Sequence, residues 1–258
     1  MTGGPSSPRF VDRFGPVSDG YARWRPAYPD TWLAELAALC AGRERAWDVA
    51  TGSGQAAVAL AAHFREVIAT DASAAQLASA APHPRVEYRI EPAEASTLRP
   101  GSVDLVTVAQ ALHWLDAARF YAEVRRVAAP GGVLAVWCYG RPEADGAELS
   151  ARLREFHDVE LGPWWPEERR AVLDAYRSLP FPFPELRVGR HAITVRWSLD
   201  QLLGYLGTWS SLSALRDAGG EDPLPALEAA LLAAWGGDRA ERREVRWPLA
   251  ARVGRVPG

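Results

Sequence analysis

The chain has 258 residues, of which 48% are hydrophobic and 24% charged, which suits one large globular domain or a core domain with an insertion. The formal net charge is −3 and no block of like charges stands out, so neither nucleic acid nor an anionic membrane is an expected partner. All 29 basic residues are arginine, and without lysine neither a Schiff-base mechanism nor a Walker-type phosphate loop is available.

The cysteine and hydropathy patterns bear on metal binding and on cellular location. Only Cys40 and Cys138 are present, and Cys138 lies in an apolar strand-like run, so we expect two reduced core thiols and no metal site. No apolar run reaches about 18 residues, and the opening MTGGPSSPRF lacks the charged and apolar regions of a signal peptide. We predict a cytoplasmic protein whose partner is a small molecule. The sequence does not indicate an oligomeric state.

The first half of the chain alternates between strand and helix patterns. Residues 1–20 are rich in glycine, proline and serine, and we expect them to be irregular before a helix within 28–40. Short, almost continuously apolar strands then alternate with helices, which predicts a doubly wound α/β fold with a mostly parallel sheet covered on both faces. The predicted strands are 46–50, 66–71, 85–90, 102–109 and 132–139, and the predicted helices are 55–64, 73–80 and 116–128.

Beyond residue 140 the composition changes. Helices rich in tryptophan and proline are predicted within 148–180, followed by a strand at 187–197, helices from about 199 to 236, and a last strand at 242–253. The two late strands alternate as half-exposed edge antiparallel strands do, giving seven strands in all. The intervening helices are expected to form a cap over the strand ends.

A glycine turn follows the first predicted strand, at the position where open parallel sheets bind ligands. In the stretch TGSG, Gly52 and Gly54 can adopt a positive φ, and the next helix offers free amide donors at its N-terminus. The stretch from Gly52 to Ala57 also satisfies the relaxed dinucleotide fingerprint. Asp71, at the end of the next strand, could accept hydrogen bonds from a ribose diol of either NAD or an adenosyl ligand.

The third and fourth strands separate these two interpretations. Glu94 follows the third strand and the stretch VAQALHW completes the fourth, so one nucleoside can lie between the two strand ends. A dinucleotide needs a second mononucleotide-binding half, and the chain turns instead into tryptophan-rich helices. This favours a single adenosyl ligand.

Five stretches carry a resemblance to a known family: YARWRPAYP (21–29), WDVATGSG (47–54), VIATDAS (67–73), PAEASTLRPGSVDLVTVAQALHWLD (92–116) and VRRVAAPGGVLAVW (124–137). With weaker matches at 174–184 and 205–212, the chain resembles class I S-adenosylmethionine (SAM)-dependent methyltransferases, in the branch of trans-aconitate methyltransferase. The resemblance implies a Rossmann-like fold with a SAM-binding core at 31–140. It also implies a cofactor-covering segment at 1–30, and at 141–258 a helical cap with the last two strands, all in one integrated domain.

The sequence departs from the family in its first motif. Ala50 replaces the usual glycine, and Thr51 replaces a second small residue. We expect the methyl group of Ala50 to cost little if its φ is negative, although the loop then lies slightly farther from the methionine end of the cofactor.

The resemblance also implies cofactor contacts. Arg25 would pair with the cofactor carboxylate and Asp71 with its ribose, although a surface ion pair, a helix cap and, for Glu94, a solvated side chain are the plain alternatives. The full set of expected SAM ligands is Tyr21, Arg25, Asp48, Ala50, Thr51, Gly52, Ser53, Gly54, Asp71, Ala72, Gln76, Ala93, Glu94, Gln110, Ala111 and Trp114.

His113 follows the fourth strand, near the expected position of the transferred methyl group. If the acceptor is a hydroxyl, His113 could be the catalytic general base; if it is a carboxylate, no base is required and His113 would orient the substrate. The expected substrate contacts are Tyr139, Arg141, Trp164, Trp165 and Trp209.

The predicted function is therefore SAM-dependent methyl transfer to a small-molecule acceptor, at a carboxylate or hydroxyl oxygen. Two alternatives stay open from the residues. One is an NAD(P)- or FAD-dependent oxidoreductase that uses the same turn, and the other is a non-catalytic protein that binds an adenosyl ligand.

Overall fold

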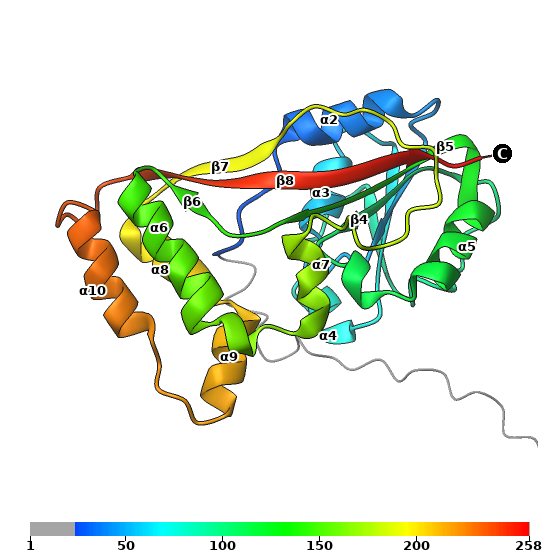
Figure 1. Cartoon of the computed structure of the whole chain (residues 1–258). Helices are drawn as coiled ribbons and strands as arrows, with labels where there is room; N and C mark the ends of the chain where they lie inside the picture. Colours follow the sequence, from blue (N-terminus) through cyan, green and yellow to red (C-terminus); the bar gives the residue numbers. More distant parts are fainter. Residues whose placement is uncertain (1–23, 258) are drawn as a thin grey trace, which may run out of the picture.

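The computed structural model describes residues 24–257, which form a mixed eight-stranded sheet flanked by helices (Figure 1). The strand order is β3-β2-β1-β4-β5-β8-β6, and β7 pairs with β8 beside this path. The strands are β1 (Arg45–Val49), β2 (Glu66–Asp71), β3 (Val86–Ile90), β4 (Val103–Ala109), β5 (Ala128–Tyr139), β6 (Glu143–Ala144), β7 (Ala192–Trp197) and β8 (Arg243–Arg255). The predicted fold class is confirmed, and the seven expected strands are joined by the two-residue β6.

Strands β1 to β5 form the parallel half of the sheet. β1 pairs with β2 on one side and with β4 on the other, so the strand order reverses direction between β1 and β4. This reversal is the topological switch point, where the strand ends leave a crevice for a ligand. The nearly continuous apolar sequences of these strands fit their burial, because helices cover both faces of the sheet.

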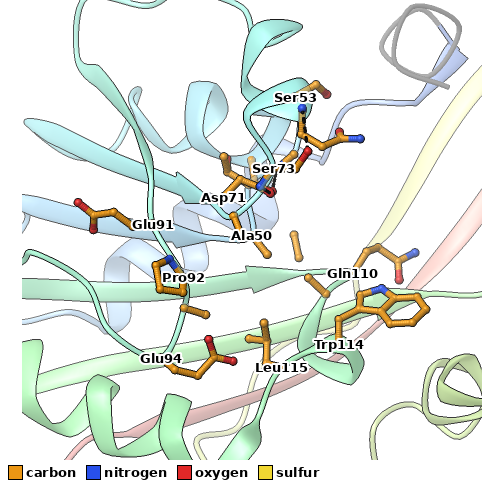
Figure 2. Close-up of a pocket in the computed structure, with 18 of the residues that line it drawn as sticks. Ala50, Ser53, Asp71, Ser73, Glu91, Pro92, Glu94, Gln110, Trp114 and Leu115 are labelled. Atoms are coloured by element: carbon orange, nitrogen blue, oxygen red, sulfur yellow. Dashed lines mark hydrogen bonds between the residues drawn. The ribbon is translucent and has the colours of Figure 1, made fainter. Parts of the chain in front are cut away.

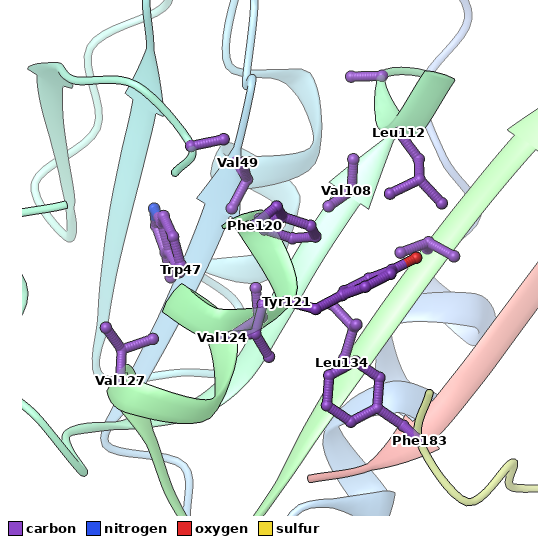
Figure 3. Packing of buried hydrophobic residues seen from close by; sticks show 14 of the residues in the cluster. Trp47, Val49, Val108, Leu112, Phe120, Tyr121, Val124, Val127, Leu134 and Phe183 are labelled. Carbon is purple, nitrogen blue, oxygen red and sulfur yellow. The ribbon is translucent and has the colours of Figure 1, made fainter. Parts of the chain in front are cut away.

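Alternate side chains of each strand point to opposite faces, and each face has its own buried cluster. Trp47 and Leu134 pack with Phe120 and Val124 of α5 (Ala117–Val127) on one face (Figure 3). The side chain of Asp116 caps this helix by accepting a hydrogen bond from the Arg119 amide at 3.1 Å. The other face is covered by α2 (Asp30–Leu39) and α3 (Gln55–Leu60), while α4 (Ala74–Ala78) follows β2.

The long strand β8 joins the sheet to the second half of the molecule. Its residues 249–255 pair antiparallel with β5, and its residues 243–248 pair antiparallel with β7. β6 pairs with β8 at residues 245 and 246, so this part of β8 has a neighbour on each side. The late strands are antiparallel as predicted, but the expectation that the last one is an edge strand is wrong.

The cap consists of short helices around a third buried cluster. Trp247 and Val245 of β8 pack there with Tyr205, Leu153 and Leu231 from three cap helices. The cap elements are α6 (Ala147–Glu155), the π-helical η3 (Phe156–Glu160), η4 (Gly162–Trp164), η5 (Glu167–Arg169), α7 (Arg170–Leu173), α8 (Leu199–Leu206), α9 (Ser210–Asp217) and α10 (Leu224–Ala234). Figure 1 shows α6, α8, α9 and α10 gathered at one end of the sheet. Within the part of the chain described, no helix is long and apolar enough to cross a membrane.

Candidate cofactor site

A cavity of about 640 Å³ opens at the carboxyl ends of β1 to β4, at the switch point (Figure 2). Four segments that follow the strands form most of its wall, as the sequence predicts. The cavity is lined by Tyr28, Ala50, Thr51, Gly52, Ser53, Gln55, Ala56, Asp71, Ala72, Ser73, Gln76, Glu91, Pro92, Ala93, Glu94, Ala95, Ala109, Gln110, Ala111, Trp114, Leu115, Asp116, Arg119, Tyr139 and Glu168.

The turn after β1 uses three residues with positive φ. Gly52 and Gly54 have φ values of 58° and 80°, as their sequence pattern predicts. Ala50 has a φ of 50°, so the condition under which its methyl group would cost little is not met. A side chain in this left-handed region costs about 1–2 kcal/mol, and the turn therefore carries strain where the family has glycine. Thr51 anchors the turn by donating its amide hydrogen bond to the Thr70 carbonyl at 3.0 Å.

Asp48 lies beneath this turn rather than in the cavity wall. It is only 1% exposed, and its carboxylate accepts hydrogen bonds from the Thr51 hydroxyl at 2.5 Å and the Thr107 hydroxyl at 2.7 Å. Burial raises the pKa of Asp48 to about 6 despite these two bonds, and the nearby Asp71 carboxylate adds to the rise. Neither Asp48 nor Gly54 lines the cavity, and both lie in or beneath the turn whose shape they help to set.

Asp71 connects the end of β2 to the glycine turn. One carboxylate oxygen accepts a hydrogen bond from the Gly52 amide at 2.9 Å, and the other accepts one from the Ser73 amide at 2.9 Å. The N-cap of α4 is Ser73, whose hydroxyl accepts the Gln76 amide, so Asp71 is not the helix cap that the sequence left as an alternative. Asp71 thus presents a carboxylate of fixed orientation to the cavity (Figure 2).

The segment after β3 forms the opposite wall. Pro92 and Ala93 line the cavity directly, and Glu94 lies beside them with its carboxylate bound to the Asp116 amide at 3.0 Å. The alternative of a merely solvated Glu94 is therefore wrong, because the side chain has this fixed backbone partner.

Gln110 is held rigidly at the end of β4. Its φ is 60°, its amide donates to the Trp137 carbonyl at 2.9 Å, and its side-chain Nε2 donates to the Tyr139 carbonyl at 2.8 Å. The Oε1 atom is buried and finds no hydrogen-bond partner among the described residues. Because Nε2 is fixed, this wall of the cavity offers an acceptor that a ligand donor could use.

His113 is placed just behind the cavity wall. Its Nδ1 shares a hydrogen bond with the Tyr176 hydroxyl at 3.1 Å, and its ring lies against Trp114, which does line the cavity. Burial, together with the nearby Arg169 cation, lowers the pKa of His113 to about 3. The imidazole is therefore neutral near pH 7, but it does not line the cavity in this structure.

The expected substrate residues divide between the cavity and the cap. Tyr139 lines the cavity, and its hydroxyl accepts a hydrogen bond from Arg25 at 3.3 Å. Arg25 itself is not in the wall; its guanidinium lies over the Tyr205 ring at 5.2 Å. The other four expected substrate residues do not line the cavity. Arg141 pairs with Asp158, and Trp164 is half-buried in η4. Trp165 and Trp209 pack against each other in the cap. Tyr21 lies outside the described residues.

Sequence reasoning missed twelve lining residues, in two groups. Most are neighbours of predicted positions on the same turns, and the motifs themselves could have included them. Tyr28 and Glu168 come from segments outside the turns that follow the strands, and no pattern in the sequence links them to the strand ends. The missed residues are Tyr28, Gln55, Ala56, Ser73, Glu91, Pro92, Ala95, Ala109, Leu115, Asp116, Arg119 and Glu168.

A parallel sheet with a strained glycine turn, a carboxylate at the end of β2 and one nucleoside-sized cavity at the switch point defines a Rossmann-like nucleoside-cofactor enzyme. A family model described as a methyltransferase domain matches residues 47–136. The chain is 34% identical to a Dictyostelium discoideum protein described as a methyltransferase, over 90% of this chain and 89% of that one.

Two further comparisons agree. A solved structure described as a type II methyltransferase from Anaeromyxobacter dehalogenans has 45% identity and a TM-score of 0.85, and covers 90% of this chain and 98% of that chain. An S-adenosylmethionine-dependent methyltransferase of Saccharomyces cerevisiae is 33% identical over 48% of this chain and 45% of that one. The chain belongs to the SAM-dependent methyltransferase family, and SAM is its cofactor. This confirms the predicted class and sets aside the oxidoreductase alternative.

Proposed function

We propose that the protein transfers the methyl group of SAM to an oxygen atom of a small-molecule acceptor. The observation that carries this proposal is the extent of the cavity, whose wall includes Gly52 and Asp71 on the cofactor side and Tyr139 on the side of the cap. A small acceptor placed beside Tyr139 would lie between the cofactor and the cap helices.

The cofactor contacts follow from the wall. The backbone of Gly52 and Ser53 would hold the methionine end of SAM, and Asp71 would accept hydrogen bonds from the ribose hydroxyls. Ala93 and Glu94 would flank the adenine. The unpartnered Oε1 of Gln110 would accept a hydrogen bond from the cofactor ammonium or from the acceptor.

An oxygen acceptor fits the charges beside Tyr139. The Arg25 guanidinium, bound to the Tyr139 hydroxyl behind the cavity wall, places a cation near the proposed position of the acceptor, and a cation favours an anionic carboxylate over an amine. A carboxylate needs no general base, which agrees with the position of His113 behind the wall. For a hydroxyl acceptor, His113 stays the predicted base, and the trans-aconitate branch likewise stays a prediction from sequence alone.

Methyl transfer requires little of the protein beyond positioning the acceptor and the cofactor. When bound, SAM supplies a methyl group on a positively charged sulfur; the acceptor oxygen forms its bond to carbon as the sulfur–carbon bond breaks, leaving S-adenosylhomocysteine. The protein would align the acceptor in line with that bond, and the apolar Trp114 and Leu115 would exclude water.

Two measurements test the proposal. Isothermal titration of the purified chain with S-adenosylhomocysteine and with NADH should give binding of the first and none of the second, and Asp71→Ala should abolish it. Radiolabelled SAM offered with a panel of carboxylic acids and alcohols should then yield methyl esters or ethers. Cofactor binding without transfer to any oxygen would favour the non-catalytic alternative, and transfer to amines alone would reject oxygen as the acceptor atom.

A further inference from the structure

The wall of the cofactor cavity carries mostly negative charge. Among its described lining residues five have a carboxylate, and Arg119 is the one with a guanidinium. At neutral pH five negative charges and one positive charge leave a formal charge of −4 on this part of the wall. We call the five carboxylates the anionic wall; they belong to Asp71, Glu91, Glu94, Asp116 and Glu168.

Backbone amides hold four of these carboxylates in place. Glu91 accepts a hydrogen bond from the Thr97 amide at 3.0 Å, and the amide bonds of Asp71, Glu94 and Asp116 are given above. An amide donor has no net charge, so these bonds fix the direction of each carboxylate without cancelling its charge. All four lie on segments that follow β2, β3 and β4, which is the side of the cavity where the cofactor is held.

Aromatic residues of the same wall also favour a cation. Trp114, Tyr28 and Tyr139 line the cavity, and the rings of the two tyrosines pack with their centroids 6.3 Å apart. The face of an aromatic ring carries partial negative charge and attracts a cation. Carboxylates and aromatic rings therefore act in the same direction on a positively charged ligand.

The Arg25 cation lies apart from these carboxylates. Its guanidinium is bound to the Tyr139 hydroxyl behind the wall and lies over the ring of Tyr205, which belongs to the cap helix α8. The anionic wall is thus concentrated on the cofactor side, and this cation on the side of the cap.

The cofactor loses its positive charge during the reaction. SAM and S-adenosylhomocysteine share one ammonium and one carboxylate group, and only SAM carries the sulfonium. Methyl transfer breaks the sulfur–carbon bond and leaves its electron pair on sulfur, so the product has a neutral thioether there. A negatively charged wall attracts the cationic form more strongly than the neutral one.

We propose that the anionic wall makes the site select SAM over S-adenosylhomocysteine, so that the product is released once its charge is lost. This inference goes beyond the proposed function, because it concerns the cofactor and its product and holds for any acceptor. Asp116 and Arg119 tune the selection in opposite directions, since both line the cavity, both are exposed, and their charges differ in sign.

Three ligands separate charge from shape in isothermal titration of the full chain. SAM is compared with neutral S-adenosylhomocysteine and with sinefungin, which carries an ammonium group where SAM has its sulfonium. At low ionic strength, SAM and sinefungin should each bind about tenfold more tightly than S-adenosylhomocysteine. This preference should shrink at high ionic strength, because dissolved ions screen exposed charges.

Substitutions at the mouth of the cavity test the sign of the effect. Asp116→Asn removes a negative charge but keeps a good helix cap, and it should lower the ratio of SAM to S-adenosylhomocysteine affinity about twofold. Arg119→Gln removes the positive charge and should raise that ratio about twofold. Asp238→Asn is the matched control, because this exposed aspartate accepts the Ala240 amide at 2.9 Å outside the cavity wall, and it should leave the ratio unchanged.

Equal affinities for SAM and S-adenosylhomocysteine, a preference that is the same at both ionic strengths, or shifts of the same sign in Asp116→Asn and Arg119→Gln would each overturn the inference. If Asp116→Asn fails to fold, Arg119→Gln and the salt dependence of the unaltered chain still decide. Absence of methyl transfer to any oxygen would instead reject the proposed function and leave this selection standing, so the two failures are distinguishable.

Discussion

Asp48→Asn should make the cofactor-free protein more stable above pH 7. Burial raises the pKa of Asp48 from 3.8 to about 6, a rise of about 2 units or roughly 3 kcal/mol against the ionised form in the folded state. The amide of the variant has no charge to desolvate, and the Thr51 and Thr107 hydroxyls can each turn to donate or accept. Allowing for imperfect pairing, we expect a net gain of about 1–3 kcal/mol.

The raised pKa of Asp48 determines how the stability gain of Asp48→Asn varies with pH. The folded protein binds the Asp48 proton more tightly than the unfolded chain, so the contribution of Asp48 to stability is fully present below pH 3.8 and is lost as the pH rises through about 6. The gain from Asp48→Asn should therefore be largest at pH 8 and shrink progressively below pH 6.

Thermal unfolding followed by calorimetry at pH 8 and pH 4.5 measures this difference. At pH 8 the melting temperature should rise by roughly 2–12 °C, given about 2–4 °C per kcal/mol for a chain of this size. Asp217→Asn, which removes the charge of an exposed aspartate, is the control and should change little. A variant less stable at pH 8, or a gain that is the same at both pH values, would refute this account of Asp48.

Three further substitutions test the cofactor site. Gly54→Ala should lower the free energy of unfolding by more than about 2 kcal/mol in chemical denaturation, because φ is +80° and the added Cβ would lie 2.9 Å from Tyr88 ring carbons. Gly101→Ala is the control, because its φ is +64° but its surroundings are open, and it should lower the free energy of unfolding by only about 1 kcal/mol. Ala50→Gly should relieve its positive φ and raise the free energy of unfolding by up to about 1 kcal/mol, and a clear loss would contradict the strain. Asp71→Asn should weaken S-adenosylhomocysteine binding about tenfold or more in calorimetric titration, as one hydrogen-bond acceptor becomes a donor; unchanged affinity would remove Asp71 from the site.

The cofactor side of the site could be predicted because its geometry is local. In a parallel sheet the turn after β1 and the end of β2 must meet at one edge, so Gly52 and Asp71 are placed by strand order alone. The positive φ of Ala50 could not be predicted, because the turn geometry is set by the hydrogen bonds around Asp48 and Thr51, and these override the intrinsic preference of alanine.

The cap side could not be predicted in the same way. Whether Trp165 or Trp209 meets the cofactor cavity depends on how β8 extends past β5 and where it carries the cap helices. These strand pairings join residues far apart in the sequence, such as Tyr139 with Leu249 and Trp197 with Arg243. Composition pointed to tryptophans as contacts, but only packing decides that Trp114 lines the cavity while Trp165 and Trp209 pack against each other in the cap.

Cofactor binding and acceptor choice depend on different parts of the molecule. The groups that would hold SAM are fixed by backbone hydrogen bonds within the parallel sheet, so a change in the cap should leave cofactor binding intact. The groups that would choose the acceptor belong to the cap, joined to the cavity by contacts between single side chains such as Arg25 and Tyr139. Acceptor choice can therefore change by substitutions in the cap alone, and the cap is where relatives with the same glycine turn are expected to differ.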